Sequence, residues 1–405
     1  MEPAEIDRRK TATYAKTLTV ISLIAFASYV ASYMRFPVVP LFARSLGINT
    51  AHIGIINSGF FLMAGALSLP LGILSDRWGR KRLATWGLLL LSASSFLLCL
   101  SGSMPQLLGI YLLFGIGMAA FGPTMMSMVA DCSPSTHLGR SYGWYTTALY
   151  CGMSLGPAVG GFVAQGFGYI PVFFISGALI ALVFGILIFF LPWQRKFSAD
   201  EGDRHLGAII IRDVVHNRPL LGCWLATLGG CFGLGMFITF IPLHAQDQGL
   251  PVSQIGMVFF VQGLCNALSR IPLGHLSDHV AHRGRLVVIG LIGFALAMAG
   301  FGISRSFISF SLFAGALGTS MGLAFTSIGA LIAETVPPES RGLAMGGYNA
   351  VIYFGMMLSS GLMGYVIQRT AFAMGFYLTA AVVLVLIVFF HLLIRGFRAP
   401  GAKVS

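Results

Sequence analysis

Charged side chains are scarce in this sequence, and acidic ones are the scarcest. Lys, Arg, Asp and Glu make up 9% of 405 residues, with 13 acids against 25 bases. Hydrophobic residues make up 56%, and the mean hydropathy is +0.84. Charged residues form about a quarter of a typical soluble domain. The composition therefore excludes an ordinary soluble protein.

The motifs of common enzyme classes are also missing. The sequence has no HExxH, no paired aspartates inside an apolar run, no GxSxG at a strand-to-helix turn and no Walker A loop. These motifs carry metal-dependent, nucleophilic and nucleotide-driven chemistry. We expect no enzyme activity, no cofactor and no metal site.

Cysteines are few and have no CxxC spacing. They lie mostly inside apolar runs, which is typical of small buried hydrophobic residues rather than of a disulfide framework. The six positions are Cys99, Cys132, Cys151, Cys223, Cys231 and Cys265.

What the sequence does contain is a succession of apolar runs long enough to cross about 30 Å of hydrocarbon as helices. They predict an all-α membrane protein with twelve transmembrane helices, at about 17–43, 52–74, 83–101, 105–130, 141–165, 170–192, 219–245, 253–275, 285–303, 307–333, 342–367 and 371–395. The predicted division is a tail at 1–16, a six-helix bundle at 17–192, a linker at 193–218, a second bundle at 219–395 and a tail at 396–405. The linker is the longest polar stretch, and 206–215 is a candidate amphipathic surface helix.

The basic surplus follows the predicted topology. With these helices, 20 of the 25 Lys and Arg fall on one side of the membrane. Short cytoplasmic loops carry such an excess. We therefore expect a multi-pass protein of the cell (inner) membrane with both termini in the cytoplasm, and we expect no nucleic-acid partner despite the net charge of +12.

An internal repeat relates the two halves. The segment from Val38 matches that from Phe240, and LPLGILSD from Leu69 matches IPLGHLSD from Ile271. Pro40 and Pro242, Gly54 and Gly256, Pro70 and Pro272, and Asp76 and Asp278 stand 202 residues apart; Asp131 and Glu334, Gly143 and Gly346, Tyr145 and Tyr348, and Gln165 and Gln368 stand 203 apart. Parallel repeats of this kind place a central cavity between two bundles, and access to it alternates between the two sides.

The stretch GILSDRWGRKR, from Gly72 to Arg82, joins the second and third predicted helices. It resembles the loop signature G-x-L-x-D-R-x-G-R-[KR] of the major facilitator superfamily, and a degenerate copy follows Gly274. The matching positions are Gly72, Leu74, Asp76, Arg77, Gly79, Arg80 and Lys81. The resemblance covers roughly 380 positions and implies an alternating-access transporter.

We expect this stretch and its copy to form a cytoplasmic gate. Asp76 can pair with cations or with the positive end of a nearby helix and so hold the two halves together. The alternative is that the cations only mark the cytoplasmic side. The predicted gate consists of Gly72, Asp76, Arg77, Gly79, Arg80, Asp278 and Arg270.

The run GMSLGPAVGG in the fifth helix resembles a signature of the superfamily's proton-driven exporters, which favours export. Small residues allow close helix packing and a proline bends the segment, so tight packing alone is the alternative. The predicted packing motif is Gly152, Gly156, Pro157, Gly160 and Gly161. Those exporters usually carry an arginine in the fourth helix where this chain has Tyr111, which puts arginine-based proton coupling there in doubt.

Ionisable residues inside membrane helices are functional candidates because burying a charge is costly. None of the acids lies near the middle of a predicted helix, whereas Arg35 lies well inside the first. Arg35 is a candidate ligand for a carboxylate or phosphate, or else a structural partner of helix-end carbonyls. His244 is a weaker candidate proton carrier. The predicted substrate-binding residues are Arg35, Asn57, Tyr111, Tyr145, Tyr150, Gln262, Asn266, Tyr348, Asn349 and Tyr353, and Tyr145 and Tyr348 are expected to face each other.

The sequence thus predicts a secondary active transporter that exports a small amphipathic or anionic organic solute. Protons are the candidate coupling ion, the lipid bilayer is the surrounding partner, and a monomer is expected. The alternatives are a uniporter or importer of an anionic metabolite, or a receptor built on the same fold, because a fold does not fix a function.

Overall fold

The computed structural model describes residues 3–191, 217–280, 282–337 and 340–395. Within them every regular element is helical, and twelve spans are long and apolar enough to cross a membrane. The first half holds α1 (Pro3–Tyr33), α2 (Val38–Ser45), α3 (Thr50–Trp78), α4 (Arg80–Cys99), α5 (Met104–Cys132), η1 (Ser135–His137), α6 (Leu138–Phe167) and α7 (Tyr169–Phe190). The second half holds α9 (Arg218–Asp247), α10 (Val252–His279), α11 (Arg283–Ile303), α12 (Phe307–Thr335), α13 (Arg341–Arg369) and α14 (Phe372–Ile394). The predicted fold class is confirmed.

The first predicted helix is in fact two. α1 ends at Tyr33 and α2 starts at Val38, with turns between them that contain Arg35 and Pro37. Proline has no backbone N–H to donate and disfavours helix in the residue before it, so the break falls here. The predicted polar tail is helical from Pro3 onward, in a segment rich in helix-forming Ala, Glu, Arg and Lys.

The stretch from Gly72 to Arg82 is almost entirely helical. α3 continues to Trp78 and α4 starts at Arg80, so the connection shrinks to Gly79 with φ of 95°. Only glycine adopts that backbone conformation readily. Gly72 itself lies inside α3, so the second predicted helix extends beyond its predicted end at residue 74. The candidate surface helix at 206–215 lies outside the described residues.

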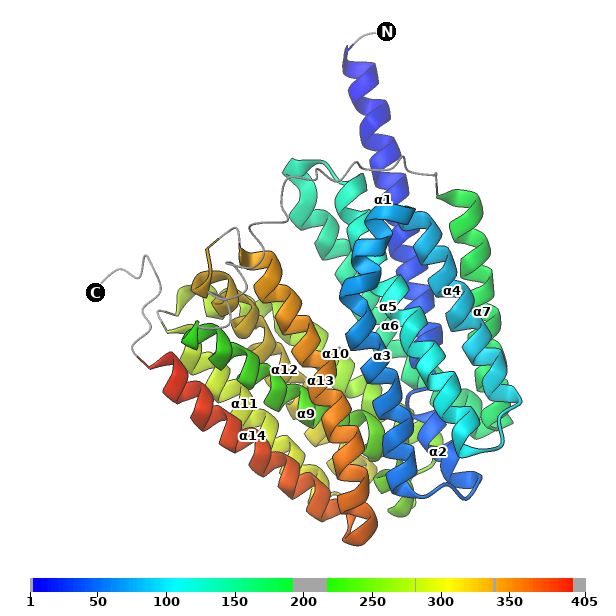
Figure 1. Ribbon diagram of the computed structural model, residues 1–405, viewed down its shortest axis with the longest axis vertical. Helices are drawn as coiled ribbons and strands as arrows, with labels where there is room; N and C mark the ends of the chain where they lie inside the picture. The colour runs from blue at the N-terminus through cyan, green and yellow to red at the C-terminus, as the bar shows by residue number, and fades with distance from the viewer. Residues whose placement is uncertain (1–2, 192–216, 281, 338–339, 396–405) are drawn as a thin grey trace.

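The helices form two bundles that lie side by side (Figure 1). In one bundle α1 packs on α6 and α5 packs on α3 and α4; in the other α9 packs on α13 and α14, and α12 on α10 and α11. The most extensive contacts between the bundles are those of α3 with α13 and of α6 with α10. A site between the bundles is therefore bordered by these four helices.

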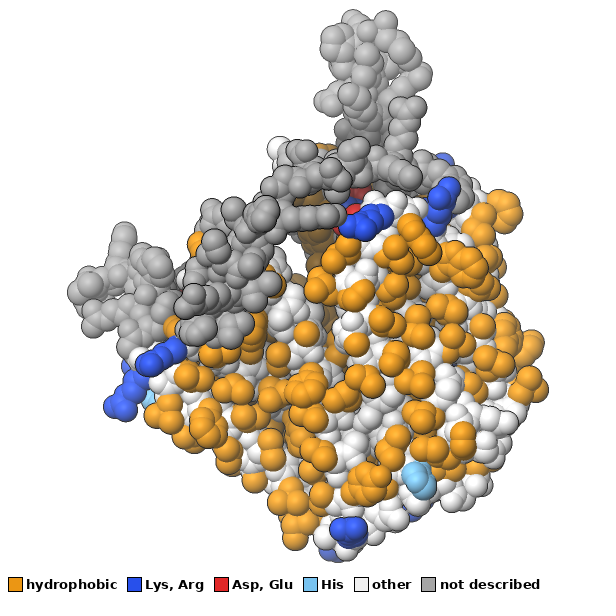
Figure 2. All heavy atoms as spheres, in the orientation of Figure 1, with side chains coloured by type: hydrophobic (Ala, Val, Ile, Leu, Met, Phe, Trp, Pro, Cys, Tyr) orange, Lys and Arg blue, Asp and Glu red, His pale blue; other side chains and the backbone are white. Residues whose placement is uncertain are grey.

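The outer surface is strongly apolar between two polar ends. Figure 2 shows hydrophobic side chains spread over the sides of the molecule and cations near its ends. Large residues such as Phe189 and Ile308 are 85% and 78% exposed. Apolar surface on this scale is stable only against lipid, so the bundles are embedded in a membrane.

Candidate functional site

The two bundles meet through glycines at one end of the molecule. We call the helix ends around Arg82 and Arg341 the basic end, and the opposite ends, around Arg44 and Gln368, the far end. On the α3–α13 seam, a Cβ atom at Gly54 would collide with the carbonyl oxygen of Ser360. The backbones therefore touch directly there, which only glycine permits.

The α6–α10 seam repeats this contact. A Cβ atom at Gly256 would collide with the carbonyl oxygen of Pro157, and one at Gly161 would lie 2.7 Å from that of Val252. Gly256 is the repeat mate of Gly54, and Pro157 stands 203 residues before Ser360. The far end is thus closed by the same contact twice, once on each seam.

The contacts disappear toward the basic end. Midway along the α3–α13 seam, a Cβ atom at Gly65 would lie 2.7 Å from the Cβ of Tyr353. Nearer the basic end, Gly72 of α3 and Gly346 of α13 have nothing within 4 Å of such an atom. Figure 1 shows the bundles diverging in this direction. The structure is closed at the far end and open at the basic end.

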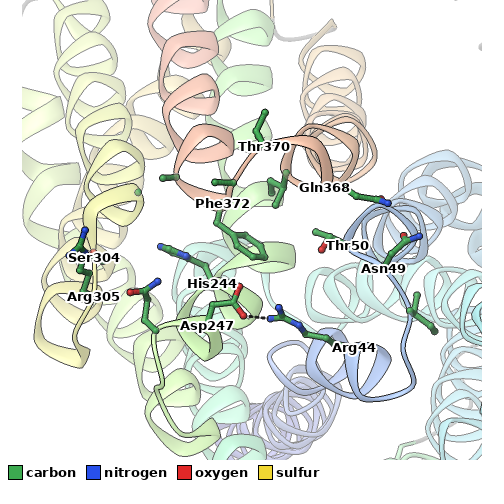
Figure 3. A pocket seen from close by; sticks show the side chains of 16 residues that line it. Arg44, Asn49, Thr50, His244, Asp247, Ser304, Arg305, Gln368, Thr370 and Phe372 are labelled. Atoms are coloured by element: carbon green, nitrogen blue, oxygen red, sulfur yellow. Dashed lines mark ion pairs between the residues drawn. The ribbon is translucent and has the colours of Figure 1, made fainter.

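An ion pair adds to the closure of the far end. Arg44 of α2 lies 2.6 Å from the carboxylate of Asp247 on α9 and also donates a hydrogen bond to the carbonyl oxygen of Leu243 (Figure 3). The pair joins the two bundles. Neither residue belongs to a motif, so the pair was not predicted from the sequence.

The ion pairs described at the basic end lie within each bundle. Asp76 lies 3.4 Å from Arg80, one turn along, and Arg80 lies 2.8 Å from Asp131 on α5. Arg77 is exposed at the end of α3. The expectation that Asp76 holds the two halves together does not apply to this conformation, since the basic end is the open one.

The second bundle contains the equivalent ion pair. Arg283 of α11 lies 3.1 Å from Glu334 of α12, and these residues stand 203 positions after Arg80 and Asp131. Arg283 is thus the structural counterpart of Arg80 in the degenerate copy. The side chain of Asp278 is outside the described residues.

Lys81 stabilises the end of another helix. Its ammonium is buried and donates to the carbonyl oxygen of Ile188 at 2.8 Å and to that of Leu191. Cations are favourable at helix C-termini, where carbonyls lack partners. The contact ties the start of α4 to the end of α7.

Arg270 lies between the bundles, not in the basic-end loop. Its guanidinium is 4.2 Å from the ring centroid of Tyr150 on α6, and its Nε donates to the side chain of Asn266 at 2.9 Å. Tyr348 of α13 lies close enough to Arg270 and to Tyr150 to interact electrostatically with both. In this conformation eight residues of helix, about 12 Å, separate Arg270 from the end of α10, so its assignment to the gate stays a prediction.

Two tyrosines of α1 extend this group. The ring centroids of Tyr29 and Tyr33 are 5.9 Å apart. Both residues lie close enough to Tyr150 and Tyr353 to interact electrostatically with them. Neither tyrosine was among the predicted substrate-binding residues. Their spacing of four residues, which places them on one helix face, was the available signal.

The glycines of the predicted packing motif bring α6 close to α1. Cβ atoms at Gly152 and Gly156 would each lie 2.6 Å from a carbonyl oxygen of α1, and one at Gly160 would collide with the carbonyl oxygen of Met34, just after α1. Gly161 instead faces α10 in the other bundle. The motif therefore serves both packing within a bundle and closure between bundles.

Arg35 is enclosed within the first bundle. It is fully buried, donates to Ser94 of α4 at 3.1 Å, and stacks 3.5 Å from the ring centroid of Phe114 on α5. Its Nε and Nη2 have no hydrogen-bond partner among the described residues, and the same holds for the hydroxyl of Tyr111. The buried Arg35 is far more enclosed than the half-buried Arg270.

The other predicted residues divide between bundle interiors and the space between bundles. Asn57 is buried and bonds within α3, Gln262 donates to the sulfur of Met321, and Asn349 is exposed. Tyr145 is buried beside Tyr29, whereas Tyr348 lies by Arg270. The repeat mates Tyr145 and Tyr348 thus have different neighbours.

Comparison with known proteins agrees with this architecture. The family model for the Major Facilitator Superfamily matches residues 21–253 and 223–404. The chain belongs to the major facilitator superfamily. It is a membrane transporter rather than an enzyme, and the resemblance seen in the sequence is confirmed.

Its relatives in the superfamily are distant in sequence. A multi-drug resistance efflux pump PmrA homolog from Lactococcus lactis is 25% identical over 378 residues, 90% of this chain and 93% of that protein. An uncharacterized MFS-type transporter from Methanocaldococcus jannaschii is 23% identical over 359 residues, 86% and 91% of the two chains. The quinolone resistance protein NorA of Staphylococcus aureus is 27% identical over 233 residues, 58% and 59% of the two chains.

Two solved structures share the fold. A bacterial homolog of the human lysosomal transporter Spinster, described as inward-facing and unoccupied, superposes with a TM-score of 0.81 at 17% identity, covering 96% of this chain and 99% of that one. The nucleoside transporter NupG superposes with a TM-score of 0.78 at 14% identity, covering 94% and 100%. Identities this low establish the fold alone.

Proposed function

We propose that the protein exports a small amphipathic organic anion by alternating access. The observation that carries this proposal is the position of Arg270, which lies between the bundles and stacks on Tyr150 of the opposite bundle. A guanidinium in a low-dielectric site attracts a carboxylate or sulfonate strongly. The tyrosines around it offer rings for the apolar part of the solute and hydroxyls for its polar part.

The distribution of acids supports an anionic solute. All carboxylates of the sequence lie in tails, in loops or near helix ends, so none can neutralise a cationic solute at mid-membrane. Arg35, the other arginine inside a span, is fully buried and has Ser94 and Phe114 as partners. Arg270 is therefore the cation that we assign to the solute.

The proposed orientation places the basic end in the cytoplasm of a cell-membrane protein. Excess Lys and Arg marks the cytoplasmic side, and the bundles are open there. The site would then load from the cytoplasm, as export requires. The similarity to a drug efflux pump over nine-tenths of the chain supports the same direction. We propose protons as the coupling ion and a monomer as the working unit.

Equilibrium binding to the purified protein tests the solute class. Titration calorimetry with 2-naphthalenesulfonate, its neutral sulfonamide and 2-naphthylmethylammonium should give the tightest binding for the sulfonate. Arg270→Gln should weaken sulfonate binding by about tenfold or more, because a hydrogen bond to a charged group contributes about 1.5–3 kcal/mol. Sulfonamide binding should stay unchanged.

The control is Arg369→Gln, which removes an exposed arginine at the end of α13. It should leave all three affinities unchanged. A second pair of variants checks the aromatic contact. Tyr150→Phe keeps the ring and should bind the sulfonate with native affinity, whereas Tyr150→Leu removes the ring and should bind it more weakly. Equal affinity for sulfonate and sulfonamide in the native protein would refute the proposal.

A further inference from the structure

The far end contains a cavity that the proposed function does not use. Its volume is about 640 Å³, within the range of small-molecule sites. Figure 3 shows its walls: Asn49 and Thr50 come from the first bundle, while Asp247, Gln368 and Phe372 come from the second. The cavity thus spans the junction between the bundles.

The charge of the lining is predominantly positive. Arg44 and Arg305 both line the cavity, against the single carboxylate of Asp247. Asp247 is already paired with Arg44 at 2.6 Å. Arg305 is exposed and has no ion-pair partner among the described residues. One guanidinium is therefore left to attract an anion.

The rest of the lining suits an organic anion rather than a bare ion. Side-chain amides of Asn49 and Gln368 can donate hydrogen bonds to acid oxygens. Phe372 projects into the cavity near His244 and offers a ring face (Figure 3). An acid group with an aromatic or aliphatic body matches this combination.

We propose that the far-end cavity is a second, regulatory site, which binds a small organic anion from the solution at the far end. It is separate from the site at Arg270: along α13, Gln368 is 15 residues beyond Tyr353, which is about 22 Å of helix. The site goes beyond the proposed function and does not depend on which solute is exported.

The position of the cavity predicts its effect. Because both bundles supply its walls, separating them at the far end would take the site apart. A ligand that binds one state only shifts the population toward that state. An anion that binds there from the solution at the far end therefore holds this end closed and inhibits transport.

Thermal unfolding of the purified protein with benzenesulfonate tests the site. This acid stays ionised and does not cross membranes, and benzenesulfonamide is its neutral counterpart. The sulfonate should raise the unfolding temperature of the native protein, and Arg305→Gln should raise the apparent dissociation constant by about tenfold. Arg369→Gln, an exposed far-end arginine that does not line this cavity, should behave as the native protein.

Arg270→Gln distinguishes this site from the central one. The proposal predicts that the shift persists in Arg270→Gln, whereas Arg305→Gln should need about ten times more benzenesulfonate for the same shift. The reverse result would place benzenesulfonate in the central site and overturn the proposal while supporting the proposed function. Absence of any shift, or an equal shift with benzenesulfonamide, would also overturn it. In right-side-out vesicles, external benzenesulfonate should slow transport by the native protein but not by Arg305→Gln.

Discussion

Two arginines lie inside membrane-spanning segments, and the structure gives them opposite surroundings. Arg35 is sealed among α1, α4 and α5, with Ser94 and Phe114 as contacts. Arg270 is half-buried between the bundles. A buried charge is retained only for a strong reason. From these contacts we propose a structural role for Arg35 and a binding role for Arg270.

We expect Arg35→Gln and Arg270→Gln to affect different properties. Arg35→Gln should lower the unfolding temperature and leave the affinity for 2-naphthalenesulfonate within about twofold, because an enclosed side chain contributes packing and hydrogen bonds rather than solute contact. Arg270→Gln should lower the affinity for 2-naphthalenesulfonate and leave the unfolding temperature unchanged. Thermal unfolding and calorimetry on the same preparations measure both effects. Loss of sulfonate affinity in a stable Arg35→Gln protein would make Arg35 a solute ligand after all.

At the scale of single residues, the sequence identifies unusual side chains but not their partners. The cost of burying charge made Arg35 a candidate ligand from the sequence alone, whereas Arg270 was assigned to the gate. The ion pair between Arg44 and Asp247 could not be predicted, because the partners are 203 residues apart and meet only when the bundles close. Its strength depends on that geometry, not on local sequence.

Among the elements, α3 and α6 of one bundle correspond to α10 and α13 of the other, and these four helices form the two seams between the bundles. Each seam is closed at the far end by glycine against backbone, and each opens toward the basic end. Backbone contact of this kind depends on the absence of a side chain. A larger residue at these positions should therefore destabilise the closed far end without affecting the fold of either bundle.

We expect Gly54→Val and Gly256→Val to shift the protein toward a state that is open at the far end. Overpacking costs about 1–3 kcal/mol, which changes a population ratio by roughly 5- to 150-fold. Spin labels at Ser103 and Ile308, in a cysteine-free background, should report a longer distance between the bundles.

Gly109→Val is the matched control for this measurement. Gly109 lies in α5, and a Cβ atom there would meet nothing within 4 Å. The variant should keep the native distance distribution. If Gly54→Val and Gly256→Val also kept it, closure through these glycines would be refuted.

At the basic end, Asp76 is weakly engaged in this conformation, since its only described ion pair is with Arg80 at 3.4 Å. We therefore assign its role to the opposite state, in which the basic end is closed. Asp76→Asn should slow transport and leave equilibrium solute affinity unchanged, because it changes the gate and not the site. Flux and calorimetry measure the two effects. A variant that loses affinity but keeps a normal transport rate would move Asp76 to the binding site.

The sequence predicted the elements better than their ends. Apolar runs set the position of each span, because a helix must cover the hydrocarbon core. The break at Arg35 and the single-residue connection at Gly79 were missed: their conformation depends on one proline and one glycine within otherwise helix-compatible residues. The sequence shows the proline and the glycine, but it does not show how far each one interrupts the helix.

At the scale of the whole molecule, the internal repeat predicted the paired architecture. Equal offsets along several helices required two similar bundles, and the ion pairs Arg80–Asp131 and Arg283–Glu334 have that same offset. The conformation could not be predicted, because one sequence supports more than one arrangement of two rigid bundles. The proposed central site was therefore only partly predictable: Tyr150, Tyr348 and Tyr353 were among the predicted residues, but Tyr29, Tyr33 and the position of Arg270 between the bundles were not.

The central claim is that an organic anion is transported through a site centred on Arg270. The most direct test is transport in inside-out vesicles, where the basic end is expected to face the outer solution. The rates of uptake of 2-naphthalenesulfonate and of its neutral sulfonamide would be measured for the native protein and for Arg270→Gln, with and without an imposed pH gradient. We predict faster uptake of the sulfonate, acceleration by the gradient, and loss of the preference in Arg270→Gln. Equal rates for both compounds in the native protein, or an unchanged preference in Arg270→Gln, would contradict this account.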